Sequence, residues 1–168
     1  MKKDQKRAMA FGTHPDDIEI GCGGTVALLA RRGFGITHVV LTSGEAGSDR
    51  VPPWEMGPAR EKEALEAAKV LGSAGVEFLR YPDGLTGFTR EMKVDIIRLV
   101  RRLRPHVVFV HERNETSLGH RVASELVLES LQAGSGPWFQ EAGGEPWSPE
   151  LILGYEVWHP LGRWELAV

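Results

Sequence analysis

The chain has 168 residues, a formal net charge of −3 and a single cysteine, Cys22. Its length suits one domain, and its near-neutral charge gives no electrostatic case for nucleic-acid binding. One cysteine excludes an intramolecular disulfide framework and a metal site built only from cysteines. The chain has no apolar run of the roughly 18 residues that suggest a membrane span, and the apolar stretch near its N-terminus is too short for a signal peptide. We therefore expect a cytoplasmic protein in which any metal site uses histidines and carboxylates.

Strand-like and helix-like segments alternate along the chain. The predicted strands cover residues 7–13, 36–42, 76–80, 106–111 and 151–158, and the predicted helices cover residues 25–32, 59–71, 90–104 and 121–132. The second strand, ITHVVLT, is almost wholly apolar, as expected for a strand that is covered on both faces. This alternation predicts an α/β fold: a Rossmann-like, open, mostly parallel β-sheet with helices on both faces.

The expected strand order tells us where a site should lie. In a Rossmann-like order the first and fourth strands are neighbours, and ligands bind at the carboxyl ends of the strands where the order reverses. Residues just after Thr13 and just after Val110 should therefore meet in space. The segment 134–149 is rich in glycine, proline and tryptophan, so we expect it to form a long surface loop that covers this site.

The first motif, His14-Pro15-Asp16-Asp17, directly follows the first strand. His14 and Asp17 offer a nitrogen and an oxygen ligand suited to zinc or iron(II). Asp16 lies beside them and is placed to take a proton from a water molecule. The alternative interpretation is that both carboxylates only cap a helix N-terminus. We expect the following glycines, at 21, 23 and 24, to form a turn before the helix begins.

The sequence resembles the LmbE-like, or PIG-L-type, metal-dependent N-deacetylases. The matching stretches are THPDDIEIGCGGTVALLARRG, LTSGEAGS, AREKEALEAAKVLG, YPDG, RRLRPHVVFVH, GHRVAS and YEVW, in family order. The family removes acetyl groups from N-acetylglucosamine-type amines, and a few relatives hydrate or hydrolyse other substrates. The resemblance implies that His14, Asp17 and His120 bind Zn²⁺, with Fe²⁺ as an alternative, and that Asp16 is the general base. It also implies that Arg60 and Asp83 contact the substrate.

The chain departs from the family at the loop after the fourth strand. The family usually has His-x-Asp-His there, and this chain has Ser117-Leu118-Gly119-His120. Ser117, which we count among the substrate-binding residues, replaces the histidine that helps to stabilise the tetrahedral intermediate. Losing such a donor costs on the order of 10²–10³ in rate. The chain is then a weaker deacetylase, has changed its chemistry, or uses another donor from this region: His111, Glu112 or Glu115.

The chain also stops at Val168, whereas family members usually continue past the YEVW-like strand. We therefore expect one domain over residues 1–168 that is short at its C-terminal end. Either the sequence is truncated, or the missing part is absent and the substrate pocket lacks one wall. The predicted function is hydrolysis of an acetyl or other acyl group from a small N-acetylated amine that resembles N-acetylglucosamine. The alternatives are a metal-binding protein with little activity and a metal-dependent hydratase or other hydrolase. The sequence leaves the oligomeric state open, a homo-oligomer included.

Overall fold

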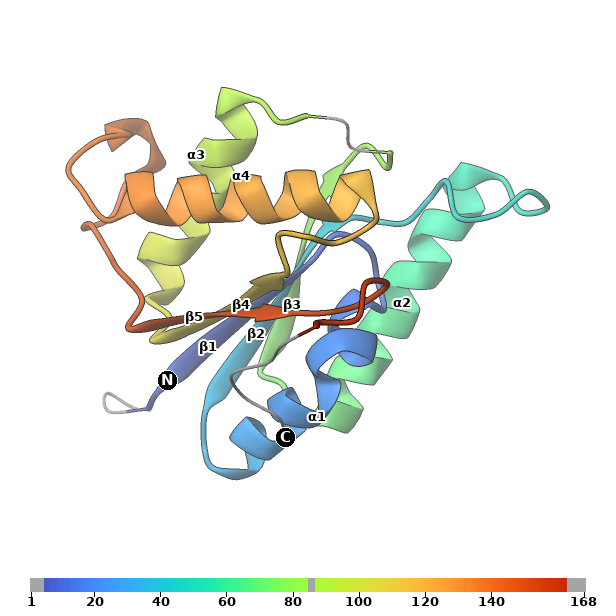
Figure 1. Cartoon of the computed structure of the whole chain (residues 1–168), viewed down its shortest axis with the longest axis horizontal. Coiled ribbons are helices and arrows are strands. Elements are labelled where there is room, and N and C mark those ends of the chain that lie inside the picture. The colour runs from blue at the N-terminus through green and yellow to red at the C-terminus, as the bar shows by residue number, and fades with distance from the viewer. Residues whose placement is uncertain (1–4, 85–86, 163–168) are drawn as a thin grey trace.

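A five-stranded parallel sheet forms the centre of the molecule (Figure 1). The computed structural model describes residues 5–84 and 87–162. The strands are β1 (Arg7–Gly12), β2 (Gly35–Thr42), β3 (Gly75–Tyr81), β4 (Val107–His111) and β5 (Leu151–Tyr155), in the spatial order β3-β2-β1-β4-β5. All four neighbouring pairs are parallel, so the carboxyl ends of the strands share one edge. The predicted fold class is confirmed.

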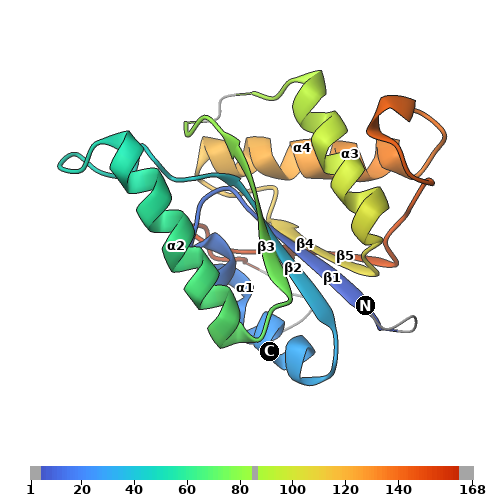
Figure 2. The ribbon, with the colours of Figure 1, turned by 180° about the vertical axis from the view of Figure 1, so that it is seen from behind.

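The helices form two layers around the sheet. Helices α1 (Asp17–Arg31) and α2 (Pro53–Leu71) lie on one face, and α3 (Arg90–Leu103) and α4 (Leu118–Gly134) lie on the other (Figures 1 and 2). The alternation along β1 supplies both interfaces. Ala8 and Ala10 pack in the cluster that contains α1, and Met9 and Phe11 pack in the cluster that contains α3 and α4. Among the described residues, no helix combines the length and the apolar character that crossing a membrane requires.

Helix α1 begins earlier than predicted, and the glycines that we expected in a turn lie within it. It starts at Asp17, the last residue of the His14-Pro15-Asp16-Asp17 motif, and continues through Gly21 and Gly24. Glycine at position 21 matches the packing of a distant strand: a Cβ atom there would lie 2.2 Å from Cδ2 of Tyr155. Tyr155 also donates a hydrogen bond of 2.6 Å from its hydroxyl to the carbonyl oxygen of Phe11. Gly21 therefore lets α1 and β5 approach each other closely.

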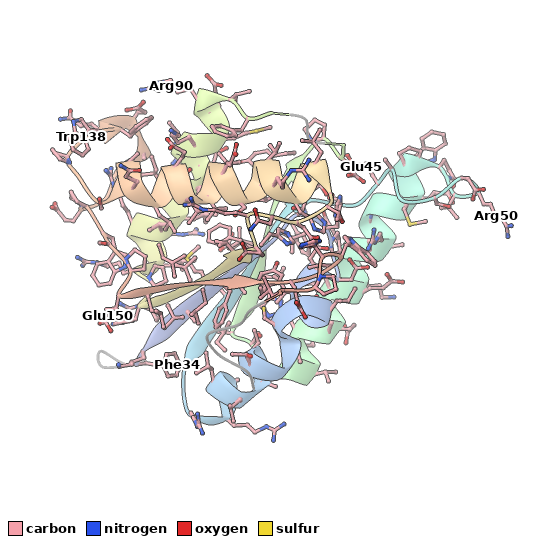
Figure 3. All side chains as sticks on the ribbon, viewed as in Figure 1. Phe34, Glu45, Arg50, Arg90, Trp138 and Glu150 are labelled. Carbon is pink, nitrogen blue, oxygen red and sulfur yellow. The ribbon has the colours of Figure 1, made fainter. Side chains whose placement is uncertain are left out.

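The prediction that segment 134–149 covers the site is wrong. Helix α4 starts at the carboxyl end of β4 and runs back along the sheet, so the loop that follows it must lie at the amino end, where β5 begins. In Figure 3 Trp138 of this loop lies at the left end of the molecule, and Glu45 of the site edge lies to the right of centre. A short 3-10 helix (Gln140–Ala142) lies within the loop. Arg101 of α3 holds the loop through hydrogen bonds to five carbonyl oxygens, those of Gly134, Gly136, Trp138, Phe139 and Gly143.

Candidate metal centre

The three predicted ligands lie together at the carboxyl edge of the sheet. His14 follows β1, Asp17 is the first residue of α1, and His120 lies in the first turn of α4. One ligand atom of each lies within 4.8 Å of the others. Nε2 of His120 is 3.3 Å from Nδ1 of His14 and 3.5 Å from Oδ1 of Asp17. The pairing of β1 with β4 brings these residues together, although His14 and His120 are 106 positions apart in the sequence.

The chemistry of this donor set fits a divalent metal. Two imidazole nitrogens and one carboxylate are the ligands of a catalytic zinc site with an open coordination position. Burial would raise the pKa of Asp17, but the neighbouring imidazoles of His111 and His14 hold it well below its usual range. Burial lowers the pKa of His120. An ionised carboxylate and a neutral imidazole are the forms that bind metal, so Asp17 and His120 are ready to act as ligands.

Asp16 lies next to this cluster and does not use its side chain as a helix cap. It is the N-cap residue of α1, but its carboxylate accepts no capping hydrogen bond. Instead, Nη2 of Arg60 donates to Oδ2 of Asp16 at 2.7 Å and to the carbonyl oxygen of Pro15 at 2.5 Å. Burial raises the pKa of Asp16, and the charge of Arg60 opposes this rise. Its side chain remains 54% exposed, so this carboxylate is accessible to a water molecule or a substrate.

Arg60 is held in this position by the loop after β2. Gly44 has a φ of +63°, and a Cβ atom there would lie 2.6 Å from Nη1 of Arg60. Only glycine allows the backbone to pass this close to the guanidinium group. We predicted that Arg60 contacts the substrate; the structure places its guanidinium against Asp16 and Pro15.

Asp83 contacts a predicted ligand directly, which sequence reasoning missed. Its Oδ1 lies 3.1 Å from Nε2 of His14, on the side of the ring away from Asp17 and His120. Glu45 supports this arrangement, because its Oε1 accepts a hydrogen bond of 2.8 Å from the backbone N–H of Asp83. The signal in the sequence was that YPDG directly follows a strand, as the HPDD motif does. A contact between Asp83 and a substrate stays a prediction.

The loop after β4 uses its polar residues internally. Ser117 is the N-cap of α4, and its hydroxyl accepts a hydrogen bond of 3.4 Å from the backbone N–H of His120. His111 is 2% exposed and Glu115 is 1% exposed. Nε2 of His111 accepts a hydrogen bond of 3.1 Å from the backbone N–H of Thr13. Two of the three suggested replacements for the missing histidine, His111 and Glu115, are thus almost fully buried and already accept hydrogen bonds from backbone N–H groups.

An open parallel sheet with a histidine–aspartate cluster at its carboxyl edge defines an α/β protein with a candidate metal centre. Residues 9–131 match the family model described as PIG-L, GlcNAc-PI de-N-acetylase, and the chain belongs to this family. It is 29% identical to the diacetylchitobiose deacetylase of Thermococcus kodakarensis, over 94% of this chain and 62% of that protein. It is 30% identical to the 4-oxalmesaconate hydratase of Pseudomonas putida, over 77% of this chain and 53% of that protein.

A solved structure agrees with the fold. The N,N'-diacetylchitobiose deacetylase of Pyrococcus horikoshii superimposes with a TM-score of 0.84 and 30% sequence identity. The match covers 91% of this chain and 61% of that one. The chain therefore spans about three-fifths of the length of these deacetylases.

Proposed function

We propose that this chain is a metal-dependent N-deacetylase domain that hydrolyses the acetamide of a small N-acetylated amino sugar. The observation that carries the proposal is the convergence of His14, Asp17 and His120 within 4.8 Å, with the partly exposed carboxylate of Asp16 next to them. The deacetylases among its relatives support the reaction and the substrate class. A cytoplasmic location and a single domain over residues 1–168 belong to the same proposal.

In this proposal His14, Asp17 and His120 hold the metal. When bound, zinc or iron(II) supplies a Lewis acid that polarises the acetamide carbonyl and makes water more acidic. Asp16 accepts a proton from the attacking water and then delivers it to the leaving amine. Arg60 holds Oδ2 of Asp16, so Oδ1 is the oxygen that exchanges this proton. The amine and acetate then leave from the same open edge of the sheet.

The proposal includes a slow chemical step. The family resemblance implies a histidine at the position of Ser117, whose hydroxyl instead accepts a hydrogen bond at the N-terminus of α4. Without a replacement donor, the developing oxyanion loses one hydrogen bond. A lost oxyanion donor typically reduces kcat by on the order of 10²–10³, so we expect turnover well below that of a relative that keeps the histidine.

Acetate release tests the proposal directly. The purified chain is incubated with N-acetylglucosamine, N,N'-diacetylchitobiose and an N-acetylglucosaminyl inositol, with chelator and then with zinc or iron(II) restored. We expect acetate from at least one amino sugar, loss of release with chelator, and recovery with metal. Release that is insensitive to chelator contradicts the metal centre. A chain that binds metal but releases no acetate contradicts the deacetylase function.

A hydratase is the second candidate, because a hydratase of Pseudomonas putida is 30% identical to this chain and Ser117 removes a feature of the deacetylases. The chemistry needs the same metal and the same proton acceptor, with water adding to a carbon–carbon double bond. The same samples can be tested with unsaturated dicarboxylic and tricarboxylic acids by following the loss of ultraviolet absorbance. Hydration without acetate release favours this second function.

A further inference from the structure

Glu115 is a buried carboxylate that the proposed chemistry does not use. It lies in the loop between β4 and α4 and is 1% exposed. Its Oε2 accepts hydrogen bonds from the backbone N–H groups of Val157 (3.1 Å) and Trp158 (2.9 Å), and its Oε1 accepts one from Thr116 (2.9 Å). These three bonds fix the position and orientation of the carboxylate. A buried charge is costly and is kept only where it is well partnered.

The same carboxylate faces the ring of His120. Nε2 of His120 points toward His14 and Asp17, so Nε2 is the nitrogen available to a metal. The opposite nitrogen, Nδ1, is buried and has no hydrogen-bond partner among the described residues. Oε2 of Glu115 lies 3.5 Å from this Nδ1. A shift of a few tenths of an ångström would close this contact into a hydrogen bond.

The ring of His120 is also prevented from turning. The ring of His111 stacks on it, with a centroid separation of 4.1 Å and an interplanar angle of 18°. In two near-parallel rings the nitrogen lone pairs lie in parallel planes and do not converge on one point. His111 and His120 are therefore poorly arranged to share a second metal ion with Glu115. The stack and the two carboxylates, Asp17 and Glu115, together leave one orientation for His120.

His14 has a matching arrangement. Its Nδ1 faces His120 and Asp17, and its other nitrogen, Nε2, lies 3.1 Å from Oδ1 of Asp83. Both candidate ligand histidines therefore have a carboxylate at the nitrogen that faces away from the cluster. Metal-binding histidines commonly donate their second N–H group to such a partner, which fixes the tautomer and strengthens the ligand.

We propose that Glu115 is a positioning residue. Its carboxylate accepts a hydrogen bond from Nδ1–H of His120, which keeps the proton on Nδ1 and leaves Nε2 free to bind the metal. The inference rests on the metal centre of the proposed function and assigns a further residue to it. Because Oε2 also holds Val157 and Trp158, the segment after β5 is tied to the metal ligand through one oxygen atom.

Zinc affinity, measured by competition with a chromophoric chelator, tests the inference. Glu115→Gln keeps an oxygen for Val157 and Trp158 but removes the charge, and we expect zinc to bind roughly 10-fold more weakly. Glu115→Met removes the acceptor, and we expect a loss of roughly 100-fold. Glu125→Gln is the matched control, because Glu125 is exposed on the same helix as His120, and its zinc affinity should equal that of the wild type.

A second measurement needs no variant. Nitrogen NMR of the zinc-loaded wild-type protein should place zinc on Nε2 of His120 and a slowly exchanging proton on Nδ1.

A purely structural role of Glu115 would have a different result in the variants. It would lower the unfolding temperature of the metal-free Glu115 variants and leave their zinc affinity unchanged.

Zinc on Nδ1 overturns the inference, and so does zinc binding by Glu115→Gln within twofold of the wild type. In those cases the wild type still binds zinc and the proposed function survives. A wild-type chain that binds no zinc overturns the metal centre and this inference together.

Discussion

Asp16 has a φ of +115°, in the left-handed region that non-glycine residues rarely adopt. Its neighbours compensate for this strain: Arg60 contacts both the carboxylate of Asp16 and the carbonyl oxygen before it. Strained backbone of this kind costs on the order of 1–3 kcal/mol and is often found at functional sites. The conformation keeps the carboxylate beside the cluster instead of over the helix N–H groups.

The first prediction concerns this carboxylate. Asp16→Asn should keep the metal, because Asp16 is not one of the three ligands, and should reduce kcat by roughly 10²–10⁴, because an amide cannot accept the proton. Metal content and acetate release measured on the same samples test both statements. Asp49→Asn is the control, because Asp49 is exposed on the loop after β2 and loses the same charge. Full activity in Asp16→Asn would contradict the assignment of the base.

Site residues could be predicted from the sequence where they lie in one motif. His14, Asp16 and Asp17 could be chosen from HPDD, and His120 from the resemblance together with the expected neighbouring of β1 and β4. The contacts of Asp83 and Glu115 could not be predicted, because each contact depends on the side-chain orientation of a histidine in another segment of the chain. We predicted that Ser117 faces the substrate, and the structure shows that its hydroxyl caps α4, a position that serine commonly takes.

In helix α1, tertiary packing outweighs the low helix propensity of the local sequence. Glycine lowers the stability of a helix interior by roughly 1 kcal/mol relative to alanine, so the stretch GCGG suggested a turn. The structure contains a helix there because the apolar face of α1 is buried against the sheet, and Gly21 lets Tyr155 pack closely on this helix. Most other boundaries lie within a few residues of the predicted ones, because strong apolar alternation and clear end signals, such as Pro105, mark them. Helix α2 is an exception and starts at Pro53, six residues before its predicted start.

The glycines of α1 give a prediction with an internal control. Gly21→Ala should destabilise the chain by about 1–3 kcal/mol, because its methyl group has no room beside Tyr155. Gly24→Ala should stabilise it by roughly 0.5–1 kcal/mol, because no atom lies within 4 Å of the added Cβ and alanine favours the helix. Chemical denaturation of the two variants measures both changes. Equal effects of the two substitutions would contradict the described packing of α1 on β5.

The loops at the two ends of the sheet have different roles. The carboxyl edge carries the candidate metal centre, and the amino edge carries the long loop that Arg101 holds. The sequence could predict which residues form this loop. The position of this loop depends on the direction of α4, which runs from the carboxyl end of β4 back to the amino edge.

Arg101 should contribute strongly to the stability of the chain. Its side chain is almost fully buried and serves five carbonyl oxygens, so Arg101→Met should destabilise the chain by about 3 kcal/mol. The neighbouring Arg102 pairs with Glu77 at the surface, and Arg102→Met should cost less than about 1 kcal/mol. Thermal unfolding compares the two variants. Zinc affinity of the folded Arg101→Met protein should be unchanged, and a large change would contradict the separation of the two ends.

The position of that loop has a practical consequence. A dye, an affinity tag or a surface linker attached near Trp138 would be held at the far side of the sheet from His14 and His120. Such an attachment leaves the approach to the metal open, so the protein can be immobilised or labelled in a defined orientation while substrates are screened.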